Sequence, residues 1–221
     1  MNLFFKALIK FLSGFIIVGL LIFIPAGTIK FYNGLLFMKL LFIPMFIGGL
    51  ILFFKNPELL KIRLNAKEKE SEQKEVIFFS AIMFILGFII AGLNYRFNWI
   101  ILPNYIVIIA SVLFIVSYIL YAEVLRENTF LSRTIEVNDN QKVIDTGMYS
   151  IVRHPMYTIT IVLFLMMPLI LGSVISFVIF LVYPFIIVKR IKNEEKVLEK
   201  DLVGYKEYEK KVQYRLIPYI W

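Results

Sequence analysis

The sequence contains no cysteine and a single histidine, His154. Without cysteine the chain can form neither a structural disulfide nor a thiolate metal site, and it has no cysteine nucleophile. One histidine leaves only carboxylate-rich clusters as metal sites, and none is grouped convincingly, so no metal is expected. Charged residues are also scarce, at 18% of the chain. Soluble globular domains carry about 25%, so a soluble domain is disfavoured.

Long apolar runs take the place of the missing charge. Hydrophobic residues make up 60% of the sequence and gather in five blocks, at residues 11–24, 35–54, 76–93, 100–122 and 155–188. About 20 helical residues cross a hydrocarbon core, so the fifth block is too long for one crossing. Its centre, Leu171-Gly172-Ser173, predicts a tight turn between two helices. The sequence therefore predicts an all-α integral membrane protein with about six transmembrane helices, the last two a hairpin.

The formal net charge of +8 is explained by the positive-inside rule, under which cytoplasmic loops retain lysine and arginine. These residues are concentrated in residues 55–74, in residues 123–153 and in the C-terminal tail, whereas the alternate connections hold few. Six crossings place every basic segment on one side. We therefore expect both termini and the active site to be cytoplasmic, and no nucleic acid to be bound. The first block follows Lys6 and Lys10 but lacks a small-residue cleavage site, so it is expected to remain as a helix.

The two halves of the chain differ in character. Residues 1–122 are expected to form a four-helix transmembrane scaffold without grouped reactive side chains. Residues 123–221 are expected to form a catalytic region made of a connector, the helical hairpin and a cytoplasmic tail. Within this region a turn is expected at residues 138–140. An amphipathic helical segment is expected over residues 189–212, interrupted at Gly204.

Two small groups of side chains could carry chemistry. Proline favours the first position of a helix, so Pro155 predicts a helix start with His154 just outside it, where anions are attracted. The alternative is that Arg153 and His154 are ordinary interfacial residues, with Arg153 extending to lipid headgroups. Arg190 and Glu194 are four positions apart, which places them on one helix face as a solvated ion pair or as site residues. The predicted hairpin brings both groups to the same membrane face.

Taken together, these elements resemble the C-terminal region of the isoprenylcysteine carboxyl methyltransferase family, which is related to membrane phospholipid N-methyltransferases. The resemblance covers roughly residues 123–221. It is carried by Gly147-x-Tyr149, Arg153-His154-Pro155-x-Tyr157, Glu194-Glu195-x-x-Leu198, Gly204-Tyr205-x-x-Tyr208 and Val212 followed by Arg215-Leu-Ile-Pro218. One departure is local: Leu202-Val203-Gly204-Tyr205 shifts the glycine by one residue relative to many members, which affects the contacts of the tail.

The resemblance implies a cytoplasm-facing pocket for S-adenosylmethionine. It implies that Arg190 faces the methyl acceptor, and it makes Arg190 and His154 the catalytic candidates. The residues implied to bind the cofactor are Gln141, Lys142, Val143, Ile144, Tyr149, His154, Pro155, Met156, Tyr157 and Glu194. The implied substrate is a lipophilic small molecule or a lipidated partner in contact with membrane lipids.

The favoured reaction is methyl transfer to the carboxylate of an isoprenylcysteine-like acceptor. Three alternatives stay open. A phospholipid or amine N-methyltransferase would require His154 or a carboxylate to act as a base, because an amine must lose its proton before attack. A nicotinamide-dependent membrane reductase has a similar C-terminal motif. A non-catalytic transporter or adaptor is disfavoured because polar groups gather at one membrane face and not at the midplane.

Overall fold

The computed structural model describes residues 2–65, 71–132, 134–135, 137 and 141–221. All the regular secondary structure among these residues is helical. Its elements are α1 (Leu3–Ala26), α2 (Tyr32–Lys55), α3 (Pro57–Leu64), α4 (Ser71–Phe97), α5 (Asn104–Glu127), the 3-10 turn η1 (Gly147–Ser150), α6 (Pro155–Ile170), α7 (Val174–Phe180), α8 (Tyr183–Asp201) and α9 (Tyr205–Lys211). The turn expected at residues 138–140 and the middle of the basic loop, residues 66–70, lie outside the described residues.

Five described segments are long and apolar enough to cross a membrane: α1, α2, Gln73–Phe97, α5 and Val174–Asp201, which joins α7 to α8. These are candidates by length and composition. The remaining apolar helix, α6, has 16 residues and is about 24 Å long, short for a core of about 30 Å. Six crossings therefore stay a prediction.

The tight turn expected at Leu171-Gly172-Ser173 is present between α6 and α7. Gly172 has φ 76°, a left-handed conformation that glycine adopts at little cost. The Ser173 hydroxyl accepts a hydrogen bond from the Ser176 backbone N–H at 3.2 Å and so caps α7. The second arm is interrupted by a turn at residues 181–182, between α7 and α8. The interruption expected at Gly204 is also present, since this residue has φ 86° and separates α8 from α9.

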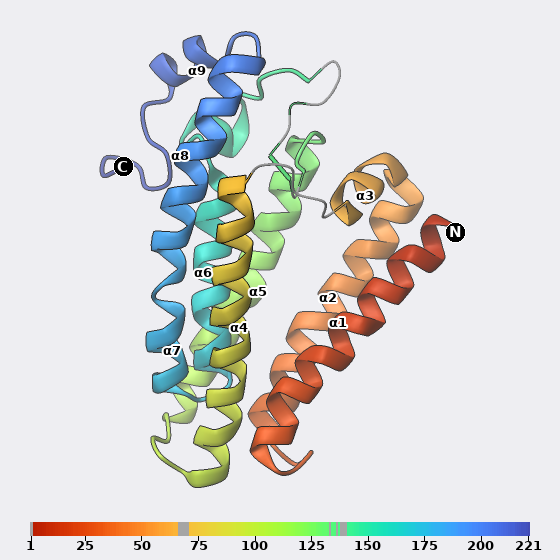
Figure 1. Ribbon diagram of the computed structural model, residues 1–221, viewed down its shortest axis with the longest axis vertical. Helices are drawn as coiled ribbons and strands as arrows, with labels where there is room; N and C mark the ends of the chain where they lie inside the picture. The colour runs from red at the N-terminus through yellow and green to blue at the C-terminus, as the bar shows by residue number, and fades with distance from the viewer. Residues whose placement is uncertain (1, 66–70, 133, 136, 138–140) are drawn as a thin grey trace.

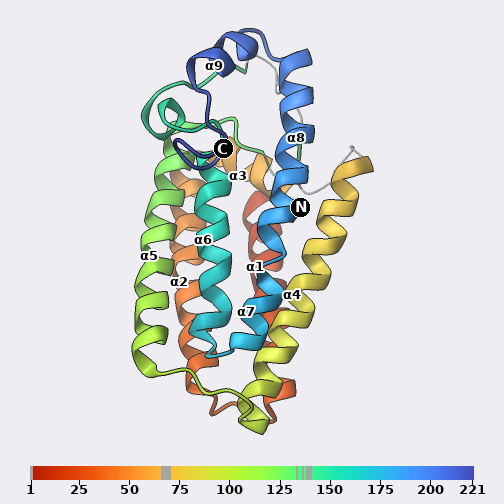
Figure 2. The ribbon, with the colours of Figure 1, turned by 90° about the vertical axis from the view of Figure 1, so that its left-hand side faces the viewer.

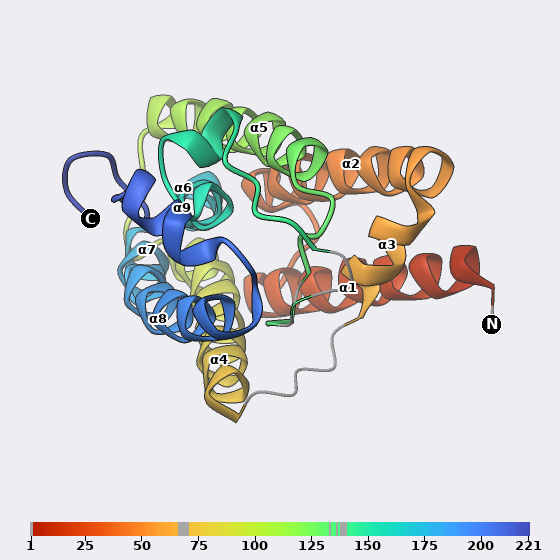
Figure 3. The same cartoon turned by 90° about the horizontal axis from the view of Figure 1, so that it is seen from above.

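The helices α1 and α2 pack against the rest of the protein at one end only. The buried residues of α1 are Ile22 and Ala26, in its last two turns, and those of α2 all lie between Gly34 and Phe42, in its first half. Beyond this end the pair leans away from the other helices (Figure 1), and Figure 3 shows the same divergence from above. The exposed apolar side chains along the divergent halves are suited to lipid chains.

The remaining helices form the body that carries the polar end. Helix α6 lies between α5 and α7–α8 (Figure 2), and α4 packs against α1, α7 and α8. The Phe84 ring contacts the Phe164 and Phe180 rings at centroid distances of 4.9 and 5.3 Å. Helix α5 continues to Glu127. The division expected between residues 122 and 123 therefore lies inside this helix and not in a loop.

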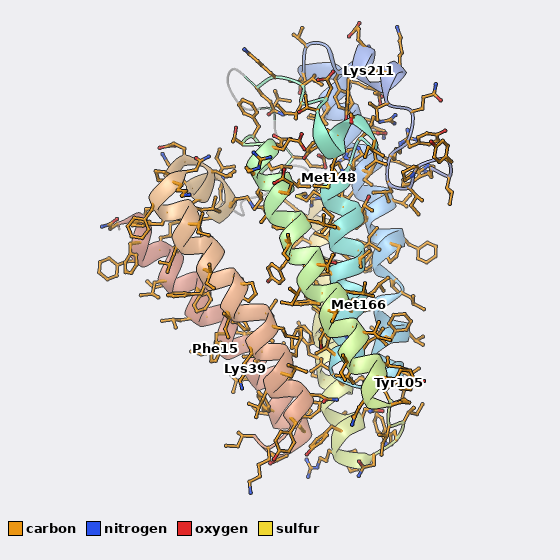
Figure 4. The ribbon with its side chains drawn as sticks, turned by 180° about the vertical axis from the view of Figure 1, so that it is seen from behind. Phe15, Lys39, Tyr105, Met148, Met166 and Lys211 are labelled. Atoms are coloured by element: carbon orange, nitrogen blue, oxygen red, sulfur yellow. The ribbon has the colours of Figure 1, made fainter. Side chains whose placement is uncertain are left out.

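Polar side chains gather at one end of this body. Figure 4 shows Met148 and Lys211 at that end, Met166 in the second half of α6 and Tyr105 at the opposite end. The connector after α5, the start of α6, the charged part of α8 and α9 all meet there (Figure 2). Both chain termini lie in the same half of the molecule (Figure 1), as the expected topology requires, although the side of the membrane stays a prediction.

Gly92 fixes how closely α4 approaches α1. A Cβ atom at this position would lie 2.5 Å from the Ile22 carbonyl oxygen and 3.0 Å from the Ala26 nitrogen, both backbone atoms that cannot move aside alone. We predict that Gly92→Ala lowers stability by about 1–3 kcal/mol through overpacking. The thermal unfolding midpoint in detergent measures the loss. Gly48→Ala is the matched control, because a Cβ there meets nothing within 4 Å, and an unchanged midpoint in Gly92→Ala would contradict this packing.

Candidate active site

A pocket opens at the polar end, enclosed by four separate parts of the chain. These are the connector after α5, the first turn of α6, the charged part of α8 and the segment that includes α9. Its lining residues are Asn128, Phe130, Leu131, Ser132, Thr134, Ile135, Gln141, Lys142, Val143, Ile144, Tyr149, Arg153, His154, Met156, Tyr157, Arg190, Glu194, Leu198, Leu202, Tyr205 and Tyr208. The pocket therefore combines tyrosine rings and aliphatic side chains with one carboxylate and several basic groups.

Tyr157 joins the two groups of side chains that the sequence singled out. Its hydroxyl donates a hydrogen bond to the Glu194 carboxylate and accepts one from Arg190 Nε at 2.7 Å. The His154 ring stacks beside the Tyr157 ring, with centroids 5.7 Å apart. The expected convergence of α8 with the start of α6 is present. Arg190 and Glu194 meet at Tyr157, however, and His154 pairs with the neighbouring glutamate.

Glu195 is the centre of a buried ionic cluster. Its Oε1 atom accepts from Arg153 Nε at 2.8 Å and lies 3.2 Å from His154 Nε2. Its Oε2 atom accepts from Arg215 Nε at 2.7 Å. Glu195, Arg153 and His154 are 3%, 7% and 6% exposed. The alternative in which Arg153 extends to lipid headgroups is therefore wrong: its guanidinium is turned inward because a buried carboxylate and backbone carbonyls satisfy its donors.

The same arginine ties the C-terminal tail to the start of α6. Arg153 Nη1 donates to the Val212 and Gln213 carbonyls at 2.9 and 3.2 Å. The backbone N–H groups of Arg153 and His154 donate to the Tyr214 and Arg215 carbonyls at 2.8 and 2.9 Å. The tail thus runs beside the helix start and covers the pocket wall that Arg153 and His154 form.

The connector is fixed by Glu127 at the end of α5. Its carboxylate accepts from the Thr146 hydroxyl at 2.9 Å and from the Met148 N–H at 3.3 Å. Gly147 has φ 49°, and a Cβ atom there would lie 2.1 Å from the Glu127 carboxylate. Glycine is therefore favoured at this turn, because its φ is left-handed and a Cβ atom would displace the Glu127 carboxylate. The turn sets Tyr149 at the pocket, where Asn128 Nδ2 donates to its hydroxyl at 3.2 Å.

Helix α9 closes the pocket with two tyrosines. The Tyr208 hydroxyl donates to the Tyr149 carbonyl at 2.7 Å. The Tyr205 hydroxyl is buried and has no hydrogen-bond partner among the described residues. Burial raises the pKa of Tyr205, and the Glu195 and Glu194 carboxylates raise it further. Tyr205 therefore stays a neutral hydroxyl, and an unpaired buried hydroxyl beside a pocket calls for a polar partner.

The structure brings nearly all of the predicted binding residues to one place. Of the ten, only Pro155 does not line the pocket, because it forms the buried first position of α6. Arg190 lines it too. Sequence reasoning assigned no role to Arg153, Glu195, Tyr205 or Tyr208, although all four lie in the quoted motifs. All four residues take part in the packing of the C-terminal segment. The spacing of residues along the chain does not reveal such contacts.

Comparison with known proteins agrees with this geometry. Residues 109–200 match the model of the isoprenylcysteine carboxyl methyltransferase family. The predicted resemblance is confirmed over this segment, which spans most of α5, the connector, α6, α7 and nearly all of α8. The match starts earlier than residue 123 and ends before α9 and the tail. A search of curated proteins found no match. The family is one of methyltransferases, and the matched segment supplies most of the pocket lining.

Arg153→Ala should detach the tail. It removes the donor to two carbonyls and leaves Glu195 short of a buried partner, which costs about 3–5 kcal/mol. We predict faster tryptic cleavage after Lys211 and Arg215, measured by mass spectrometry under native conditions. Arg126→Ala serves as the control, because Arg126 forms a solvent-exposed pair with Glu123, and exposed pairs contribute little to stability. Equal cleavage rates in the two variants would contradict the conclusion that Arg153 holds the C-terminal tail in place.

Proposed function

We propose that this protein transfers a methyl group from S-adenosylmethionine to the carboxylate of a lipid-tailed, isoprenylcysteine-like acceptor. The observation that carries the proposal is the meeting of Glu194 and Arg190 at Tyr157, in a pocket built largely from the family-matched segment. The Glu194 carboxylate and the Arg190 guanidinium both hydrogen-bond to the Tyr157 hydroxyl. The carboxylate would bind a cationic cofactor, and the guanidinium would bind an anionic acceptor.

The pocket residues suit the chemistry of the cofactor. S-adenosylmethionine carries a positive sulfonium, an ammonium and a polar nucleoside. Glu194 would bind the ammonium through charge-assisted hydrogen bonds, and the rings of Tyr149 and Tyr157 would face the cation. The unpaired Tyr205 hydroxyl supports the presence of a polar ligand, because a buried group without a partner is rare and costly.

When bound, the cofactor supplies an electrophilic methyl group that a carboxylate can attack in one displacement. The acceptor carboxylate is ionised near neutral pH, since such groups have pKa values of about 3.5. The chain therefore needs no general base; it has to position both groups and exclude water. Arg190 would orient the acceptor, and the tail held by Arg153 would keep the pocket wall closed.

His154 fits a positioning role better than that of a base. Its Nε2 atom is engaged by Glu195 at 3.2 Å, and the ring is buried against Tyr157. An amine acceptor would require a base that removes a proton, whereas a carboxylate acceptor requires none. Binding of a nicotinamide cofactor would instead favour the reductase alternative.

The cofactor assignment is tested by calorimetric titration of detergent-purified protein with S-adenosylhomocysteine. We predict binding that Glu194→Ala weakens by about 10- to 100-fold, because it removes a charged hydrogen bond. Glu199→Ala is the control, since Glu199 is exposed on the same helix. Absence of binding in folded protein, in detergent and in lipid nanodiscs, would rule the proposal out, as would equal effects of the two variants.

Arg190→Ala separates acceptor recognition from cofactor binding. We predict a fall in methyl transfer to N-acetyl-S-farnesylcysteine of at least about 100-fold, while affinity for S-adenosylhomocysteine changes less than about threefold. Transfer from radiolabelled cofactor provides the measurement, with Lys192→Ala, an exposed cation on the same helix, as the control. Joint loss of cofactor binding and turnover would refute the separate roles.

A further inference from the structure

Arg63 brings a cation from the N-terminal half to the edge of the pocket. It lies on α3, which starts at Pro57 and is capped by Asn56 Oδ1 accepting from the Leu59 N–H at 3.1 Å. Leu59 and Leu60 are buried, and Arg63 follows them at helical spacings of four and three, on the same inward face. Lys61 points the other way, with a side chain that is 71% exposed.

The contacts of Arg63 lead to the site. Its Nη2 atom donates to the Tyr121 hydroxyl of α5, and its Nη1 atom lies 3.9 Å from the Met156 sulfur of α6. Met156 also lines the pocket. A residue of the expected scaffold therefore lies directly behind a residue of the pocket wall, which sequence order gave no reason to expect.

Among the residues that the structure describes, no anionic group is paired with Arg63. A guanidinium has five N–H donors and carries its charge at every physiological pH. Here the acceptors are a phenol oxygen and a thioether, and a thioether is a weak acceptor. A partly buried cation with only neutral partners is costly unless an anion joins it.

Arg63 and Arg190 approach adjacent residues at the start of α6. Arg63 contacts Met156 from α3, whereas Arg190 donates to Tyr157 from α8 at 2.7 Å. Both cations thus border the first turn of α6. At this end of the molecule the α1–α2 pair lies apart from the body (Figure 1). Exposed apolar side chains such as Phe46 and Ile47 lie along that pair and are suited to a lipid tail.

We infer that Arg63 is a specificity-determining residue that selects an anionic acceptor and disfavours one with an ammonium group. This inference rests on the proposed function, because it identifies the class of acceptor for the same site. Arg63 attracts the carboxylate as the acceptor approaches from the bilayer, and Arg190 orients it beside the cofactor pocket. The two positive charges repel an amine headgroup, as like charges do across any partly desolvated interface.

The test measures KM and kcat separately for N-acetyl-S-farnesylcysteine in nanodiscs of neutral phosphatidylcholine. We predict that Arg63→Ala raises KM by about tenfold or more, as expected for loss of a charged contact, with kcat changed less than about threefold. Arg63→Lys should recover part of the affinity, because lysine restores the positive charge but not the two-pronged hydrogen bonding of the guanidinium. Lys61→Ala, exposed on the same helix, should leave KM unchanged.

The carboxamide of the same acceptor distinguishes charge recognition from packing. Its inhibition constant should be equal in the native protein and in Arg63→Ala, since the amide carries no charge. An unchanged KM for the acid in Arg63→Ala overturns the inference, as does an equal loss of affinity for acid and amide. A KM effect seen only when anionic phosphatidylglycerol is added also overturns it, because Arg63 would then bind a lipid headgroup.

Binding of S-adenosylhomocysteine to each variant separates this inference from the proposed function. Retained binding shows that Arg63→Ala is folded, so a normal KM then counts against Arg63 alone. If the native protein itself fails to bind S-adenosylhomocysteine, the proposed function fails first.

Discussion

The site depends on one buried carboxylate. Glu195 is 3% exposed and holds Arg153, His154 and Arg215, which come from the start of α6 and from the tail. Bringing these charges out of water is expensive, and the cost is offset only when every partner is in place. The cluster is therefore strongly cooperative: α6, α8 and the tail adopt this arrangement together or not at all. Its neighbour Glu194 lines the pocket and accepts from Tyr157, so the adjacent glutamates have different surroundings: one lies in a buried ionic cluster and one at the pocket.

Around this cluster the protein separates its membrane-facing and polar parts. The apolar helices hold the body through aromatic packing, and the polar end is built from the charged part of α8, α9, the connector and the tail. The N-terminal pair is attached at the opposite end and diverges toward the site (Figure 1). The short helix α3, which follows α2, contacts the body through Arg63, whose guanidinium donates a hydrogen bond to the Tyr121 hydroxyl of α5. The side chain of Arg63 on α3 and the polar pocket thus meet at the same helical turn, at Met156–Tyr157.

Much of the fold follows from patterns visible in the sequence. Apolar blocks gave the long helices, Pro155 gave the start of α6, and Gly172 and Gly204 marked turns because both adopt left-handed conformations. Helix ends were less predictable: α5 passes the expected boundary and continues to Glu127, since the helix does not stop where its apolar character does. The division of the second arm into α7 and α8 was also not predicted, because an uninterrupted apolar block does not show where a turn interrupts it.

The pocket lining was predictable where motif residues touch it directly, as with Tyr149, Tyr157 and Glu194. Contacts between distant segments were not. Arg153 looked like an interfacial cation because nothing in its local sequence indicates that it donates to Val212 and Gln213. Arg63 lies in a half without chemical motifs, and only the contacts of its side chain with Tyr121 and Met156 relate it to the site. Spacing identifies residues on one helix face, whereas tertiary contacts decide what that face meets.

Hydrogen–deuterium exchange with and without S-adenosylhomocysteine tests the central claim, that the tail and α9 close a cofactor pocket over the start of α6. The account predicts slower exchange of backbone amides in residues 141–149 and 202–216 when the ligand is present. Exchange in residues 27–34 and 98–103, at the opposite end of the molecule, should not change. Protection confined to those distant loops, or no protection at a saturating concentration, would contradict the account.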